Sequence, residues 1–212
     1  VVHNNKPSDA FAGIDRNICV DNVRLAASTP IHGTGRWERV IGAGEIANIN
    51  DPASQVTGLA RGANHFRWTV TRGECSSVDE VVINYNLIDA NAGENEIICS
   101  NSTQLMASNP LPGEGTWGVL GGSGSANFAD ITDPYTSVSN LDQGDNILTW
   151  TVNHKGCVSV SQVVITNNSP TLAHAGPDQA LCEPTVILAA NVPVVGQGQW
   201  TIRNGGGDFA LN

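Results

Sequence analysis

The sequence has few charged side chains and no long apolar run. Charged residues make up 14% of the chain, and the formal net charge is −10. Only 10 of the 212 residues are Lys or Arg, and they are scattered, whereas binding to nucleic acid phosphates needs clustered basic side chains. No apolar run reaches the ~18 residues of a membrane-spanning helix. We therefore expect neither nucleic acid as a partner nor membrane insertion in this segment.

Methionine is nearly absent, occurring once, while Gly occurs 23 times and Val, Ile, Thr, Ser and Asn are abundant. β-Branched residues favour strands, and Gly, Ser and Asn favour the turns between strands. A hydrophobic content of 40% argues against a disordered chain. The composition therefore predicts a folded, all-β protein.

One short phrase of sequence, Gly-x-Gly-x-Trp, occurs three times. It appears as Gly33-Thr34-Gly35-Arg36-Trp37, and its tryptophan returns 80 residues later at Trp117 and 83 residues after that at Trp200. A fixed period of this size indicates tandem structural units. The middle residue of the phrase varies between copies, as a turn permits. We expect a tight turn in each copy at Gly33 and Gly35, Gly113 and Gly115, and Gly196 and Gly198.

The period divides the chain into four parts. Residues 1–9 are expected to be the last strand of a preceding repeat plus a linker, because Val1-Val2 resembles Val81-Val82 and Val163-Val164. Residues 10–86 form repeat 1, residues 87–169 form repeat 2, and residues 170–212 are the N-terminal part of a truncated repeat 3. The linkers are short, which favours an extended string of units with limited bending.

Within each repeat, apolar residues alternate with polar ones. Phe66, Trp68 and Val70 alternate in repeat 1, and Leu148, Trp150 and Val152 alternate in repeat 2. A period of two indicates a strand with one buried face. Some seven short strands in about 80 residues, separated by turns, predict a small Ig-like antiparallel β-sandwich.

The five tryptophans admit two interpretations. Aromatic faces can stack on sugar rings, which would favour glycan binding. However, the alternation places Trp68 and Trp150 with the buried residues of their strands, where aromatic side chains contribute most to stability. We therefore predict that all five lie in the structural core: Trp37, Trp68, Trp117, Trp150 and Trp200.

The cysteines recur with the repeat. Cys19, Cys99 and Cys182 occupy an early position, and Cys75 and Cys157 occupy a late one. The repeat favours one bridge inside each unit, Cys19 with Cys75 and Cys99 with Cys157, leaving Cys182 with a partner beyond residue 212. No Cys-x-x-Cys motif supports the alternative of metal ligation. Disulfides indicate an oxidising compartment outside the cytosol.

Groups that could perform catalysis do not recur or converge. The histidines 3, 32, 65, 154 and 174 fall at unrelated positions in the repeat, and no nucleophile stands near a base in the sequence. We expect no enzyme activity and no catalytic residue.

The only cofactor that the sequence suggests is Ca²⁺ at the unit junctions, which would need several converging oxygens. Repeat 2 has Asn95 where the other copies have Asp, and the alternative is a set of Asx turns. The candidate ligands are Asp15, Asp51, Asp133 and Asp178.

The repeats resemble a known family through a longer motif. Its order is Ala-Gly-x-Asp, Cys, Pro-x-x-Gly-x-Gly-x-Trp, Asp-Pro, Gly-x-Asn-x-Phe/Leu-x-Trp-Thr-Val, Cys and Val-Val-Ile. This motif is similar to the PKD-like and Ig-like repeats of very large Bacteroidetes cell-surface proteins, including gliding-motility adhesins. The resemblance implies export by the type IX secretion system and a position on the cell surface.

The resemblance implies a structural stalk that holds a binding end away from the cell, with adhesion by multivalency as an added role. The implied partners are neighbouring repeats of the same chain and surface polysaccharide or other cell-surface proteins. Two alternatives stay open. The repeats could be spacers or carbohydrate-binding modules of a secreted polysaccharide-degrading enzyme, or they could be self-assembling elements of a surface filament.

Overall fold

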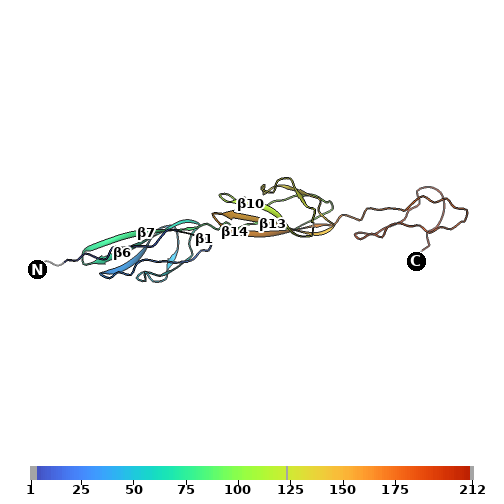
Figure 1. The fold of residues 1–212 in the computed structure, drawn as a ribbon. Coiled ribbons are helices and arrows are strands. Elements are labelled where there is room, and N and C mark those ends of the chain that lie inside the picture. The colour runs from blue at the N-terminus through green and yellow to red at the C-terminus, as the bar shows by residue number, and fades with distance from the viewer. Residues whose placement is uncertain (1–3, 123, 211–212) are drawn as a thin grey trace.

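The computed structural model describes residues 4–122 and 124–210. Of residues 1–9, for which the sequence predicts the last strand of a preceding repeat plus a linker, residues 1–3 lie outside the described residues. Figure 1 shows two β-sandwich units and a third segment that follow one another along one direction. We call residues 10–86 unit 1, residues 87–169 unit 2 and residues 170–210 the third segment.

Unit 1 is a sandwich of two sheets. One sheet has the strand order β1-β7-β6-β3, and the other has the order β2-β5-β4. All pairs are antiparallel except β1 with β7, which is parallel. The strands are β1 (Arg16–Ile18), β2 (Val23–Arg24), β3 (Thr34–Ile41), β4 (Glu45–Ile46), β5 (Gln55–Thr57), β6 (Gly62–Arg72) and β7 (Cys75–Tyr85).

Unit 2 repeats this topology strand for strand. Its sheets have the orders β10-β13-β14-β8 and β11-β12-β9, and β8 again pairs with β14 in parallel. The strands are β8 (Glu96–Ile98), β9 (Thr103–Gln104), β10 (Glu114–Gly121), β11 (Asn127–Phe128), β12 (Ser137–Ser139), β13 (Gly144–His154) and β14 (Cys157–Asn167). The prediction of a tandem array of small Ig-like β-sandwiches is confirmed.

The core of each unit lies between its two sheets. Along β6 every second residue is buried, so that Phe66, Trp68 and Val70 are 0% exposed. The ring of Trp68 meets that of Trp37, its partner in the pairing of β3 with β6, at a centroid distance of 5.0 Å. Burying an apolar side chain of this kind stabilises the fold by about 2–3 kcal/mol. The tryptophan pair therefore forms the centre of the sandwich.

The third segment is organised differently. None of its residues is in a strand, and none is buried. It contains the counterparts of β1 to β3 in sequence, but no counterpart of the long strands β6 and β7 that supply most of the core in unit 1. Among the described residues, no helix is long and apolar enough to cross a membrane.

Candidate functional site at the junction between units

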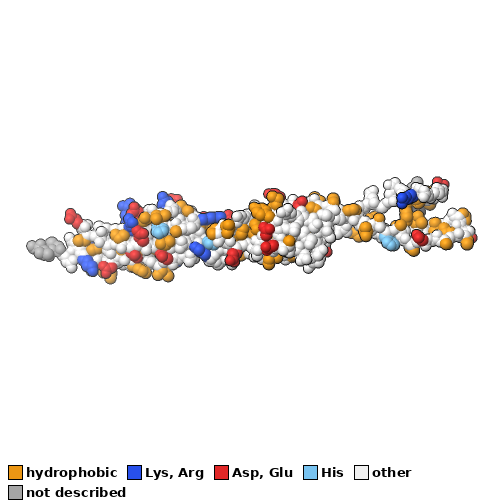
Figure 2. Space-filling model, turned by 90° about the horizontal axis from the view of Figure 1, so that it is seen from above, with side chains coloured by type: hydrophobic (Ala, Val, Ile, Leu, Met, Phe, Trp, Pro, Cys, Tyr) orange, Lys and Arg blue, Asp and Glu red, His pale blue; other side chains and the backbone are white. Residues whose placement is uncertain are grey.

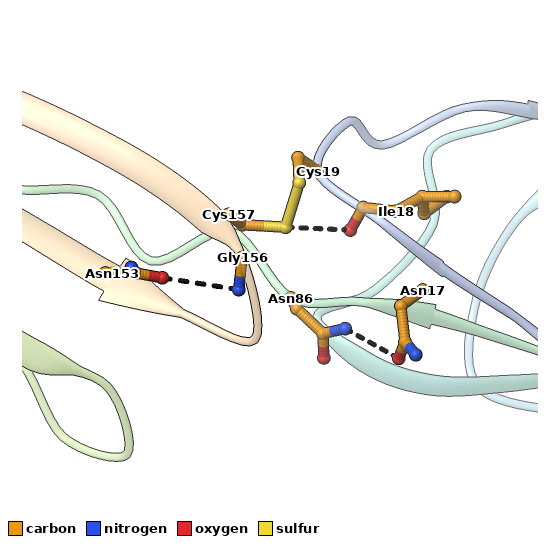
Figure 3. Close-up of a disulfide and its surroundings, with 7 residues drawn as sticks. All are labelled: Asn17, Ile18, Cys19, Asn86, Asn153, Gly156 and Cys157. Carbon is orange, nitrogen blue, oxygen red and sulfur yellow. Dashed lines mark hydrogen bonds between the residues drawn. A yellow bond between two sulfur atoms is a disulfide. The ribbon is translucent and has the colours of Figure 1, made fainter.

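Units 1 and 2 are joined by a disulfide bond. Cys19, which follows β1, is bonded to Cys157, the first residue of β14, across 138 residues of sequence (Figure 3). The Cα atoms of the two cysteines are 5.2 Å apart, inside the range that an unstrained bridge requires.

Strand direction explains why these two cysteines meet. Because β1 runs parallel to β7, Ile18 pairs with Tyr85. Cys19 therefore lies at the end of unit 1 from which the linker, the segment between β7 and β8, leaves. The turn between β13 and β14 pairs His154 with Cys157 and lies at the end of unit 2 that faces unit 1. The bridge therefore spans the junction and holds the two units end to end.

The predicted pairing of cysteines within units is wrong. Cys75 begins β7, and Tyr85, ten residues later on the same strand, is the residue that lies beside Ile18. Ten residues of strand extend about 33 Å, whereas bridged cysteines need Cα atoms within about 7 Å. A bond between Cys19 and Cys75 is therefore impossible in the folded unit.

The same geometry excludes the bond predicted in unit 2. Ile98, just before Cys99, pairs with Asn167, which is ten residues beyond Cys157 on β14. Each unit thus carries one cysteine at each end rather than one internal bridge. In this structure the thiols of Cys75, Cys99 and Cys182 are free and exposed.

Asn86 reinforces the junction from the linker side. Its backbone N–H donates to the carbonyl oxygen of Ile18 (3.0 Å), and its Nδ2 donates to Oδ1 of Asn17 (2.9 Å). The Cys157 Sγ lies 3.4 Å from the same Ile18 oxygen. That approach is a van der Waals contact and not a hydrogen bond, because a disulfide sulfur carries no hydrogen. Asn86 is only 5% exposed, so its backbone and side chain are fixed where the chain leaves unit 1.

The rest of the linker is tied to both units. The side chain of Asp89 pairs with Arg61 of unit 1, and the backbone N–H of Ala90 donates to Oγ of Ser159 in β14 (3.0 Å). Both members of the ion pair are at least half exposed, so the pair contributes little to stability. The covalent link across the junction is the bridge between Cys19 and Cys157.

Four of the five tryptophans are buried inside units 1 and 2. Trp37, Trp68, Trp117 and Trp150 are 0–3% exposed. The Nε1–H groups of Trp37 and Trp117 donate to the carbonyl oxygens of Asp51 and Asp133, at 3.0 Å in each case. Their ring faces are covered by protein and are not open to a sugar.

Trp200 departs from the predicted core position. It is 39% exposed and lines a hollow of about 390 Å³ with other residues of the third segment. Its counterparts Trp37 and Trp117 pack on β6 and β13, for which the third segment has no equivalent. Trp200 therefore lacks the strand against which its counterparts pack.

The second glycine of the repeated phrase has a different role from the predicted turn. Gly35 and Gly115 lie within β3 and β10, where they pair with Val70 and Val152. A Cβ atom on either glycine would overlap the indole of the neighbouring tryptophan, Trp68 or Trp150. These two glycines are required because the indole occupies the space of a side chain. Gly33, just before β3, has a φ of +104° and does belong to a turn.

Three of the four candidate calcium ligands, Asp15, Asp51 and Asp133, accept local hydrogen bonds. Asp15 Oδ1 accepts the N–H of Val82 (2.8 Å), and Asn95 makes the same bond to Val164 in unit 2 (2.9 Å). The position therefore needs an acceptor oxygen and not a charge. Asp51 and Asp133 each accept the N–H two residues ahead, as in an Asx turn.

Asp178 is exposed in the third segment. Among the residues that the structure describes, no group of three or more His, Cys, Asp or Glu side chains is placed to hold a metal ion.

One buried polar residue was not recognised as important from the sequence. Asn64, at 0% exposure, donates from Nδ2 to the carbonyl oxygens of Ala60, Gly62 and Ile83, and its Oδ1 accepts N–H groups of Ala43 and Ala60. Asn146 makes the equivalent set of donated bonds in unit 2. The Gly-x-Asn spacing, repeated at the start of both long strands, is the signal that marks it.

No protein-family model matches the chain, and no curated protein sequence matches it. Solved structures similar to it include the insect immune protein hemolin, with 7% identity over 78% of this chain and 48% of that one, at a TM-score of 0.49. Extracellular domains 3–5 of Drosophila OTK match with 9% identity over 73% of this chain and 59% of theirs (TM-score 0.40).

A three-Ig fragment of titin matches with 8% identity over 76% of this chain and 65% of its own length, at a TM-score of 0.41. The chain thus spans about half of the hemolin chain and less than two thirds of the other two.

Proposed function

We propose that this chain is part of a load-bearing stalk in a large extracellular surface protein. The observation that carries the proposal is the bond between Cys19 and Cys157, which fixes two Ig-like units end to end. A covalent bond across a domain boundary resists bending and pulling. Independent modules on a flexible linker do not need such resistance.

The shape of the chain supports a spacer role. The units follow one another along one direction (Figure 1), and the space-filling view shows apolar and charged side chains interspersed along an elongated outline (Figure 2). Exposed side chains of both kinds thus lie along the length of the chain, as a solvated spacer requires. The disulfide fits a location outside the cytosol.

The sequence motif supports a more specific proposal for the kind of surface protein to which the stalk belongs. Its resemblance to the PKD-like and Ig-like repeats of Bacteroidetes surface proteins supports an adhesin exported by the type IX secretion system and acting in gliding motility. In such a protein the units extend a distal binding end, and many weak contacts along the array add to adhesion.

The buried tryptophans disfavour the carbohydrate-binding alternative. A stacking platform needs an exposed aromatic face, and the four tryptophans of units 1 and 2 are 0–3% exposed. A spacer attached to a hydrolase would share the same architecture, so the coding sequence on either side distinguishes the two roles.

The proposal is tested on intact cells that produce the protein. Antibodies against units 1 and 2 should label unpermeabilised cells along thin projections, and deletion of the gene should reduce attachment and gliding. Labelling that appears only after permeabilisation, or a hydrolase domain in the same reading frame, would contradict the stalk of an adhesin.

A further inference from the structure

The two cysteines that bond between units each have an equivalent at another unit end. Cys75 begins β7 directly after a hairpin turn, as Cys157 begins β14, and the pairing of Arg72 with Cys75 matches that of His154 with Cys157. Cys157 is 2% exposed because unit 1 covers it, whereas Cys75 is exposed. Cys75 therefore lies at the end of unit 1 that corresponds to the bridged end of unit 2.

The chain that enters unit 1 approaches this hairpin as the linker approaches the hairpin of unit 2. Arg72 donates to the carbonyl oxygen of Lys6 (3.4 Å), and a Cβ atom on Gly73 would lie 3.1 Å from Nδ2 of Asn5. Farther along, Ala10 N–H donates to Ser77 Oγ (2.9 Å), the counterpart of the bond from Ala90 to Ser159. Cys75 is thus presented to whatever precedes residue 4, as Cys157 is presented to unit 1.

The opposite end of unit 2 repeats the surroundings of Cys19. Cys99 follows β8 as Cys19 follows β1, and β8 pairs with β14 in parallel as β1 pairs with β7. The backbone N–H of Asn168 donates to Ile98 (2.7 Å), as that of Asn86 donates to Ile18 (3.0 Å). The thiol of Cys99 is exposed on the side of the third segment.

From these equivalences we propose that every junction of the array carries the same bridge, from the early cysteine of one unit to the late cysteine of the next. Cys75 then bonds to an early cysteine in a unit before residue 4, and Cys99 bonds to a late cysteine in the unit that begins with the third segment. Cys182 bonds to a late cysteine one unit farther on. Each bridge forms by thiol–disulfide exchange, in which two thiols lose two protons and two electrons to a disulfide oxidant, which is reduced to two thiols.

This series of bridges, which we call the ladder, creates a continuous covalent path for tension. Between Cys75 and Cys99 the chain runs along β7, through the linker and along β8. The next bridge passes the load to the start of a last strand, where the same path begins again. Residues 20–74 and 100–156, which lie between the early and the late cysteine of one unit, are outside this path.

A doubled chain tests the ladder without any other sequence. In this chain, residues 1–172 are followed directly by residues 10–212. Ala10 stands three residues before Gly13, as Ala173 stands three residues before Gly176, so the junction between the copies has the same length as the natural one after unit 2. The purified chain is oxidised with glutathione disulfide, alkylated and digested, and its linked peptides are identified by mass spectrometry.

The ladder predicts three linkages: Cys19 with Cys157 in each copy, and Cys99 of the first copy with Cys75 of the second. Cys75 of the first copy and Cys99 and Cys182 of the second should be alkylated. Because the two copies yield identical peptides, a version with Cys75→Ser in the first copy and Cys99→Ser in the second assigns the third linkage to one pair of cysteines. Replacing Cys75 of the second copy (Cys75→Ser) should leave Cys99 of the first copy alkylated and both other bridges intact.

Alkylation of both Cys99 of the first copy and Cys75 of the second, in a chain where both Cys19–Cys157 bridges have formed, would overturn the ladder. A peptide linking Cys19 to Cys75 would overturn it as well. If the chain fails to form either Cys19–Cys157 bridge, the junction geometry from which the ladder is inferred is wrong. The inference concerns cross-linking alone, and it would stand if the cell-surface experiments contradicted an adhesive role.

Discussion

The indole of Trp68 occupies the space that a side chain on Gly35 would need. Gly35 lies in β3 opposite Val70, and Trp150 covers Gly115 of unit 2 in the same way. The Gly-x-Gly-x-Trp phrase thus combines a turn glycine, a glycine that admits one tryptophan of the core pair, and the other tryptophan itself.

Replacing either strand glycine should destabilise its unit. Gly35→Ala and Gly115→Ala force the fully buried indole to shift, and overpacking of this kind costs about 1–3 kcal/mol and occasionally more. The free energy of unfolding, measured by denaturant titration with tryptophan fluorescence, should fall by that amount. Gly121→Ala in β10 is the matched control, because its Cβ would make ordinary contact at 3.8 Å with Ile147. Equal stability of Gly115→Ala and the control would show that the indole is not held as described.

Replacing Asn64 or Asn146 with Ala should lower the free energy of unfolding as much as truncating a buried apolar side chain does. Replacing Asn64 with Ala removes the partners of several buried backbone groups, at a cost of about 1–3 kcal/mol for a group left unsatisfied. The unfolding free energy of Asn64→Ala should fall by about 3 kcal/mol. The exposed Asn22, which joins only weak side-chain bonds of 3.4 Å, is the control for an Asn→Ala change. A loss below that of Asn22→Ala would contradict the anchoring role.

Loss of the bridge should destabilise both units although neither contains it. When one unit unfolds beside a folded neighbour, the bridge closes a loop on the order of 70 residues, which is worth about 4 kcal/mol in the chain-entropy estimate. Cys19→Ser should lower the unfolding free energy by up to this amount and widen the distribution of inter-unit orientations in small-angle scattering. Cys75→Ser, which removes a free thiol, should change neither quantity. Identical behaviour of the two variants would show that the bridge does not stabilise the junction.

Calcium should have no effect on the stability of units 1 and 2. Asp15 accepts a backbone hydrogen bond that Asn95 also accepts, so Asp15→Asn should keep the bond. The melting temperature should be the same with excess Ca²⁺ and with excess chelator, in the unaltered chain and in Asp15→Asn. A rise with Ca²⁺ that Asp15→Asn removes would establish the aspartate as a ligand.

The sequence predicted the fold well because its signals are local or periodic. The alternation around Trp68 and Trp150 predicted the buried face of the long strands, and the return of Trp37 at Trp117 predicted the unit length. Such signals depend on residues that are close in sequence or on copies of the same unit.

The cysteine pairing could not be obtained in that way. The repeat identifies Cys19 and Cys99 as equivalent, but it does not say whether a partner belongs to the same unit or the next. The decisive fact is the parallel pairing of β1 with β7, which places Cys19 and Cys75 at opposite ends of unit 1. The place of Trp68 over Gly35 likewise depends on the register between β3 and β6.

The bridge between Cys19 and Cys157 should carry the tension between units 1 and 2. Single-molecule force spectroscopy, which pulls the chain from its two ends, measures this role most directly. In the oxidised chain, tension bypasses the residues between the two cysteines, so unfolding of units 1 and 2 should release almost none of their length. After reduction, or in Cys19→Ser, the same pull should release additional contour length on the order of 500 Å, from the 138-residue separation at about 3.6 Å per residue. Full release of that length from the oxidised chain would contradict the account.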